Sequence, residues 1–174
     1  MPNLNRGRTT LILFIITATI WYALSRYLPD GHWRDTLIIG FTFLFCGVFL
    51  WSLFTTLKRI YGNSGHLWKE LILASFNVFI FLLAFAGVYS EIGIVDTTRD
   101  GSPITHDFWL TSYYSIITFT STGYGDFQPQ GIGRVLASLH ALVGYFRLGL
   151  MASTGLTVIQ WRAEGSGVNR GADQ

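Results

Sequence analysis

Four long runs of apolar residues, separated by short polar stretches, dominate the pattern of this chain. They cover residues 10–28, 36–57, 71–90 and 132–161. A helix needs about 20 apolar residues to cross the hydrocarbon core of a bilayer. The 10 acidic residues of the chain lie outside these runs or at their edges, as the cost of a charge in hydrocarbon demands. The pattern therefore predicts four transmembrane helices.

The first run also allows a second interpretation, a cleaved signal peptide. Arg6 and Arg8 precede it, and the small residues at 23–25 resemble a cleavage site. The length of the run and its aromatic pair, Trp21 and Tyr22, suit a membrane interface better. We therefore expect a retained span.

Composition agrees with a membrane protein and excludes other classes. Of all residues, 50% are hydrophobic and 13% are charged, against about 25% charged in soluble domains, which excludes a disordered chain. A net charge of +2 without a basic run argues against nucleic-acid binding. One cysteine excludes a disulfide scaffold. An enzyme has almost no support, since the sequence offers no nucleophile–base pair and no phosphate loop.

Positive charges set the expected orientation, because Lys and Arg favour the cytoplasmic side of a membrane. They precede the first run, lie between the second and third runs, and follow the fourth at Arg162. The segment 91–131, between the third and fourth runs, instead has five acidic residues and one basic residue, Arg99. We expect both termini in the cytoplasm and segment 91–131 outside.

The outer segment is too long for a simple connection, and it has two parts. Residues 94–105 are polar and predict an exposed loop. Residues 106–120 are amphipathic and aromatic, and predict a helix of about 14 residues with Thr105 as its cap. This helix is too short to span, so it is expected to enter the membrane and return, surrounded by protein or a water-filled cavity.

The sequence Ser-Thr-Gly-Tyr-Gly-Asp at 121–126 follows this short helix. A selective cation site needs several oxygens that point at one axis and replace the water around the ion. Gly123 and Gly125, at alternate positions, permit the left-handed backbone angles that turn successive carbonyls the same way. Ser121 adds a hydroxyl oxygen at the inner end. The pattern predicts a cation pore.

With these residues the chain resembles the potassium channel family, whose filter reads Thr-Val-Gly-Tyr-Gly. Ser121 departs from that filter but keeps the hydroxyl, and Thr122 places a hydroxyl where packing is normally apolar. The resemblance covers about residues 67–161. It implies an outer helix, a re-entrant pore helix, a filter and an inner helix. The first two predicted spans lie outside the resemblance, so we expect an all-α membrane protein whose pore helices are preceded by two extra transmembrane helices. Neither extra helix has the regularly spaced arginines of a voltage sensor.

The resemblance also implies a function: a potassium-selective channel that conducts K+ passively across the cell membrane as a homotetramer. The expected K+ ligands are Ser121, Thr122, Gly123 and Tyr124, and Gly125 completes the filter. No organic cofactor is expected. The two departures leave a weakly selective Na+/K+ channel open as an alternative. A subunit of a potassium uptake transporter is more distant, because such chains repeat a degenerate pore loop.

Support for the filter is expected from Asp126. Ile117 stands where some relatives carry a glutamate, so Tyr113 is the nearer hydrogen-bond partner. The acidic outer segment is expected to gather cations at the mouth, unless it is merely a solvated loop.

The inner helix has one glycine of interest, Gly144. By resemblance it is a hinge, and by its size it is equally a site of close helix packing. Counting at helical spacing predicts a stripe along the cavity and its gate: Gly144, Tyr145, Leu148, Ala152 and Leu156.

Arg147 is unexpected, since a charge at this depth costs at least about 2.5–3.5 kcal/mol on insertion scales. It has three expected positions: the cavity, a contact with Asn77 of the outer helix, or a seam between subunits, where it would snorkel or hold a lipid phosphate. We favour the seam, with membrane lipid as the candidate partner.

The chain is thus expected to have three regions. They are an N-terminal two-span region at 1–62, a pore module at 63–165 and a short cytoplasmic tail at 166–174.

Overall fold

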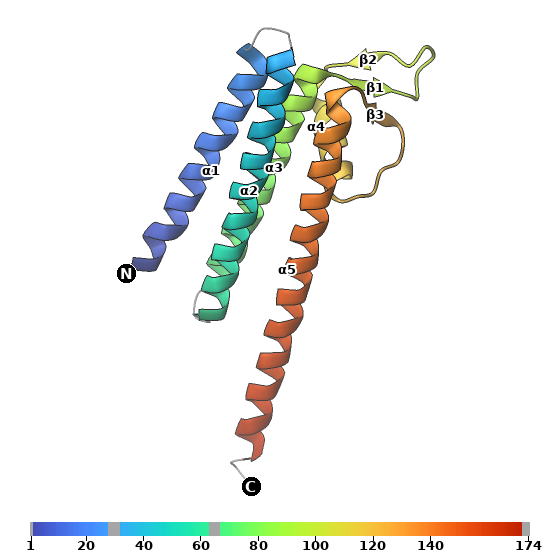
Figure 1. Ribbon diagram of the computed structural model, residues 1–174. Helices are drawn as coiled ribbons and strands as arrows, with labels where there is room; N and C mark the ends of the chain where they lie inside the picture. Colours follow the sequence, from blue (N-terminus) through green and yellow to red (C-terminus); the bar gives the residue numbers. More distant parts are fainter. Residues whose placement is uncertain (1, 28–31, 63–66, 172–174) are drawn as a thin grey trace.

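Long helices dominate the computed structural model, which describes residues 2–27, 32–62 and 67–171 (Figure 1). The four long helices are α1 (Pro2–Tyr27), α2 (His32–Gly62), α3 (Leu67–Ile92) and α5 (Ile132–Gly171), and α4 (Phe108–Phe119) is short. Within the described ranges, three helices are long and apolar enough to cross a membrane, over Asp35–Lys58, Lys69–Ile92 and Ile132–Thr157. The expected all-α membrane protein is confirmed.

Helix α1 lies beside α2 (Figure 1) and contributes to the bundle core. Phe14 stacks on Phe45 of α2 at 5.0 Å between ring centroids, and Trp21 meets Phe85 of α3 edge-on at 4.8 Å. Its apolar part, Leu11–Leu24, is shorter than the three spans. The first apolar run therefore forms a packed helix, and its crossing of the membrane stays a prediction.

The bundle is held together by stacked aromatic rings, which pack best offset or edge-to-face. Phe81 of α3 stacks on Phe49 of α2 with centroids 4.0 Å apart. Phe85 of α3 stacks on the fully buried ring of His140 of α5 at 3.9 Å. One continuous core thus joins the two extra helices to the predicted pore module.

Segment 91–131 contains a three-stranded antiparallel sheet that the sequence did not predict, beyond the C-terminal end of α3 (Figure 1). Strand β1 (Ile94–Asp96) lies in the middle, between β2 (Ile104–Thr105) and β3 (Phe127–Pro129). All three residues of β1 are buried. The exposed loop expected over 94–105 is wrong at both its ends, because strands of two or three residues are too short for an alternating pattern to reveal them.

Helix α5 is unbroken from Ile132 to Gly171, so residues 166–171 of the expected tail are helical. Residues 172–174 of that tail, and the expected boundary after residue 62, lie outside the described residues or at their edge. The division of the chain into three regions stays a prediction.

Candidate functional site

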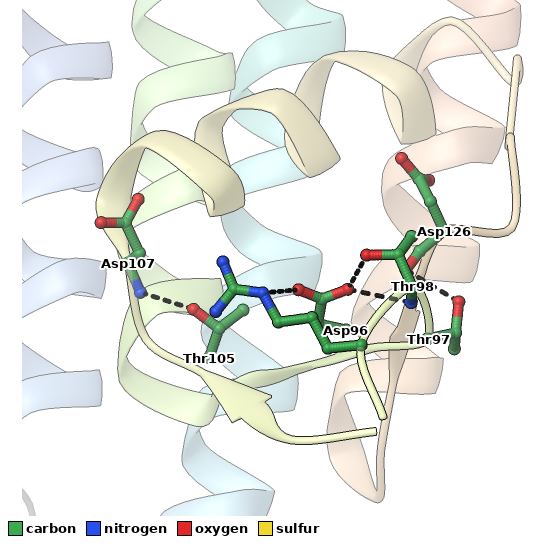
Figure 2. A network of polar contacts seen from close by, with 7 residues as sticks. Asp96, Thr97, Thr98, Thr105, Asp107 and Asp126 are labelled. Atoms are coloured by element: carbon green, nitrogen blue, oxygen red, sulfur yellow. Dashed lines mark hydrogen bonds and ion pairs between the residues drawn. The ribbon is translucent and has the colours of Figure 1, made fainter. Parts of the chain in front are cut away.

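The short helix α4 is capped by Asp107 rather than by the expected Thr105. The Asp107 carboxylate accepts hydrogen bonds from the backbone N–H groups of Trp109 and Leu110, each at 2.9 Å, which satisfies donors that a helix start leaves free. Thr105 lies two residues before this cap, and its hydroxyl oxygen accepts a hydrogen bond from the Asp107 N–H at 3.2 Å (Figure 2). The Ser115 hydroxyl donates to the Leu82 carbonyl at 2.8 Å and so anchors α4 to α3.

After α4 the backbone takes left-handed angles at alternate positions. The φ angles are 55° at Ser121, 50° at Gly123 and 83° at Gly125. The two glycines have the predicted conformation, and Ser121 adds one that the sequence did not predict. Left-handed angles cost a non-glycine residue about 1–2 kcal/mol, and such strain concentrates at functional sites. The alternation is the backbone geometry that a series of inward carbonyls needs.

Hydrogen bonds from the end of α4 hold the first residues of this strand. The N–H of Thr122 donates to the Ile117 carbonyl at 2.9 Å, and that of Ser121 donates to the Thr118 carbonyl at 3.0 Å. The unusual Thr122 hydroxyl lies 2.8 Å from the hydroxyl of Thr120. The Thr120 hydroxyl is therefore the hydrogen-bond partner of the Thr122 hydroxyl, which the sequence left unexplained. Sequence reasoning did not identify Thr120 in this role.

The predicted partnership of Tyr113 and Asp126 is present. The Tyr113 hydroxyl donates to the Asp126 carboxylate at 2.7 Å, and this bond raises the pKa of Tyr113 to about 12. The Tyr113 ring also meets Phe127 of β3 edge-on at 5.9 Å. These two contacts connect the middle of α4 to the residues that directly follow Gly125.

Gly144 packs directly against the end of α4. A Cβ atom added at Gly144 would lie 2.8 Å from the carbonyl carbon of Phe119 and closer still to its oxygen. Helix α5 runs through this position without a break. Of the two interpretations of Gly144, the structure shows the close-packing one.

The five residues of the expected stripe on α5 do not share one exposed surface. Gly144 is buried, whereas the other four residues are exposed in the single chain: Tyr145, Leu148, Ala152 and Leu156. Their cavity-lining role stays a prediction, and Gly144 does not share their surface.

Arg147 lies in none of the expected places. Its side chain is fully buried within one chain, and its guanidinium carbon lies 4.7 Å from the ring centroid of Phe49 in α2. Nη2 donates to the Ala74 carbonyl of α3 at 3.1 Å, one turn from the expected Asn77. Nε and Nη1 have no hydrogen-bond partner among the residues that the structure describes. The subunit seam and the lipid contact at Arg147 are therefore wrong, since other helices of its own chain enclose this side chain.

Arg147→Met is expected to leave unitary conductance within about twofold of wild type, because this charge does not face the ion path. The change removes a cation–π contact of about 2 kcal/mol and a charged hydrogen bond of about 1.5–3 kcal/mol. It also relieves a buried charge that costs about 2.5–3.5 kcal/mol. The two losses exceed this gain by no more than about 2.5 kcal/mol, so the thermal midpoint of the purified protein should fall modestly at most.

Arg147→Ala is the matched comparison, since it removes the same charge but leaves a cavity that costs about 2–5 kcal/mol. It should lower the thermal midpoint further than methionine does. A several-fold rise in unitary conductance in both variants would instead place Arg147 in the ion path.

Comparisons with known proteins agree with this geometry. Residues 77–160 match the family described as "Ion channel", which points to a channel rather than an enzyme. The chain is similar to "Probable potassium channel protein 2" from Methanocaldococcus jannaschii, with 32% identity over 77 residues. The match covers 44% of this chain and 19% of that protein, so the chain spans about a fifth of its relative's length. No solved structure matches. Together with the Ser-Thr-Gly-Tyr-Gly sequence and the short helix that leads into it, these matches support a potassium channel family for residues 77–160 of this membrane protein.

Proposed function

We propose that this protein is a potassium-selective channel that conducts K+ passively as a homotetramer. The observation that carries the proposal is the alternation of left-handed angles at Ser121, Gly123 and Gly125, at the end of a re-entrant helix. A backbone with this alternation can turn successive carbonyls toward one side, where they would replace the water of an ion. The proposed K+ ligands come from residues 121–124, with the Ser121 hydroxyl at the inner end. The potassium channel name of the archaeal relative agrees with this function.

Four chains are needed because one filter strand surrounds no ion, and closed symmetry is the usual form of such assemblies. The Tyr124 side chain is 71% exposed in the single chain although it lies within the filter. Tyr145 on α5 is 72% exposed. Neighbouring subunits that cover these side chains would give the filter a dry surround, which supports the tetramer.

We further propose four spans with both termini in the cytoplasm, so that the filter exit and the sheet face outward. The Arg26 guanidinium of α1 pairs with the Glu91 carboxylate of α3 at 2.9 Å. Glu91 begins the acidic outer segment, so this pair supports an outer position for the end of α1.

A weakly selective Na+/K+ channel is the second candidate, and the hydroxyl pair of Thr120 and Thr122 favours it. In the family this position is normally apolar, and a polar contact holds the filter less tightly against its surroundings. A potassium uptake transporter gains no support from the match to the ion channel family.

Recordings from purified protein in planar bilayers, with K+ on one side and Na+ on the other, test the function directly. The reversal potential measures selectivity: it should shift toward the K+ equilibrium potential by about 59 mV for each tenfold preference for K+ over Na+, since both ions carry one charge. A displacement near zero supports the weakly selective channel. The absence of any cation current in correctly assembled wild-type protein would contradict both candidates.

A further inference from the structure

The outer loop is fastened to the exit of the filter through one threonine. The N–H of Thr97 donates to the Asp126 carbonyl at 2.9 Å. Its hydroxyl lies 2.9 Å from the carbonyl oxygen of Gly125 and 2.9 Å from that of Asp126. Figure 2 shows Thr97 beside Asp126 at the end of β1. Since a hydroxyl has one proton and the N–H already serves Asp126, the hydroxyl is available to Gly125.

The Gly125 carbonyl needs such a partner because packing does not orient it. Gly125 has no side chain, and no atom lies within 4 Å of where a Cβ would be. Glycine also populates more backbone conformations than any other residue. A carbonyl oxygen has two lone pairs, so it accepts from Thr97 with one while the other remains for an ion. The hydrogen bond therefore decides which way this last filter carbonyl points.

Thr97 is in turn held in place by the sheet and by a buried carboxylate. Asp96 of β1 pairs with Phe127 of β3, and its carboxylate accepts from the N–H and the hydroxyl of Thr98 at 3.0 and 2.6 Å. The Arg99 guanidinium lies 3.1 Å from the same carboxylate. The Thr98 hydroxyl lowers the pKa of Asp96, so this anchor stays charged at neutral pH.

We propose that Thr97 is a positioning residue for the outermost ion site of the filter, acting through the carbonyl of Gly125. This inference rests on the proposed ion conduction. Segment 94–105 is then a brace for the filter exit, and its fastening sets how firmly the outermost site holds K+.

Slow exit of Ba2+ from the filter measures this site. Ba2+ is close to K+ in size, so we expect it to bind among the filter oxygens inside the outermost site, where K+ at that site would delay its outward exit. Thr97→Val removes the hydroxyl and keeps the shape of the side chain. The external K+ concentration that halves the outward exit rate should rise at least about two- to tenfold, the equivalent of one neutral hydrogen bond, because a tetramer loses four of them.

Three further variants control the experiment. Thr97→Ser keeps the hydroxyl and should retain the wild-type K+ dependence, and Thr97→Ala should shift it as valine does. Thr105→Val removes a hydroxyl from the same sheet without a filter contact, and should leave the dependence unchanged.

An unchanged dependence in Thr97→Val, or an equal shift in Thr97→Ser, would overturn the inference. Failure of both hydroxyl-free variants to assemble would overturn it as well, because the hydroxyl would then serve folding. Another outcome would support the inference in a stronger form: Thr97→Val and Thr97→Ala assemble but conduct no ions, while Thr97→Ser conducts. A wild-type protein that passes no K+ would instead contradict the proposed function itself.

Discussion

Alanine at Gly123 or at Gly125 is expected to abolish potassium-selective conduction while the protein remains folded in the membrane. Both residues have left-handed backbone angles, with φ of 50° and 83°. Left-handed backbone angles cost alanine about 1–2 kcal/mol. In a tetramer this cost would arise four times around one ion path. Since each 1.4 kcal/mol is tenfold in an equilibrium, the conducting backbone should become a minor state. Bi-ionic K+/Na+ recordings on each variant give the measurement.

Gly101→Ala is the matched control for this prediction. Gly101 has a φ of 79° and no atom within 4 Å of an added Cβ, but it lies in the outer loop away from the filter. It carries the same backbone cost without touching the proposed ion path, so its reversal potential should match wild type. Wild-type selectivity in Gly123→Ala or Gly125→Ala would show that the filter is elsewhere.

Gly144→Ala is expected to lower the yield of assembled, conducting protein at least tenfold. An added Cβ would lie 2.8 Å from the carbonyl carbon of Phe119 and 3.0 Å from its Cα. Backbone atoms cannot rotate away as a flexible side chain does, so α5 or the end of α4 must move. Such overpacking costs about 1–3 kcal/mol, directly beneath the first filter residue. Size-exclusion chromatography and flux through reconstituted vesicles measure assembly and conduction on the same sample.

Gly149→Ala separates this effect from a general effect of alanine on the inner helix. Gly149 lies on α5, and nothing is within 4 Å of its added Cβ. Alanine there should gain up to about 1 kcal/mol of helix propensity, with normal assembly. If Gly144→Ala assembled fully and changed only the open probability, a hinge at Gly144 would explain the result and close packing would not.

Local sequence patterns determined the helices of this protein and the left-handed backbone at Gly123 and Gly125. Apolar runs of span length predict helices wherever they occur, since a backbone in hydrocarbon must satisfy its own hydrogen bonds. The runs at 36–57, 71–90 and 132–161 all lie within long helices. Gly123 and Gly125 were predictable because the absence of a Cβ is a property of the residue itself. Predicting the hydrogen bond between Tyr113 and Asp126 needed more than local patterns. It needed the resemblance to a family and the expected short helix that contains Tyr113.

Only the tertiary structure decided the contacts of Arg147, Gly144 and Thr97. Each depends on a partner far away in the chain: Arg147 on Phe49 and Ala74, Gly144 on Phe119, and Thr97 on the Gly125 carbonyl. Helical spacing states which side of α5 a residue occupies but not which helix covers that side. A short strand such as β1 has too few residues for a pattern, and its pairing appears only when β3 returns from the filter. The physical reason is that side-chain periodicity is set by the local backbone, whereas close packing and hydrogen bonds between distant segments are set by how the helices meet.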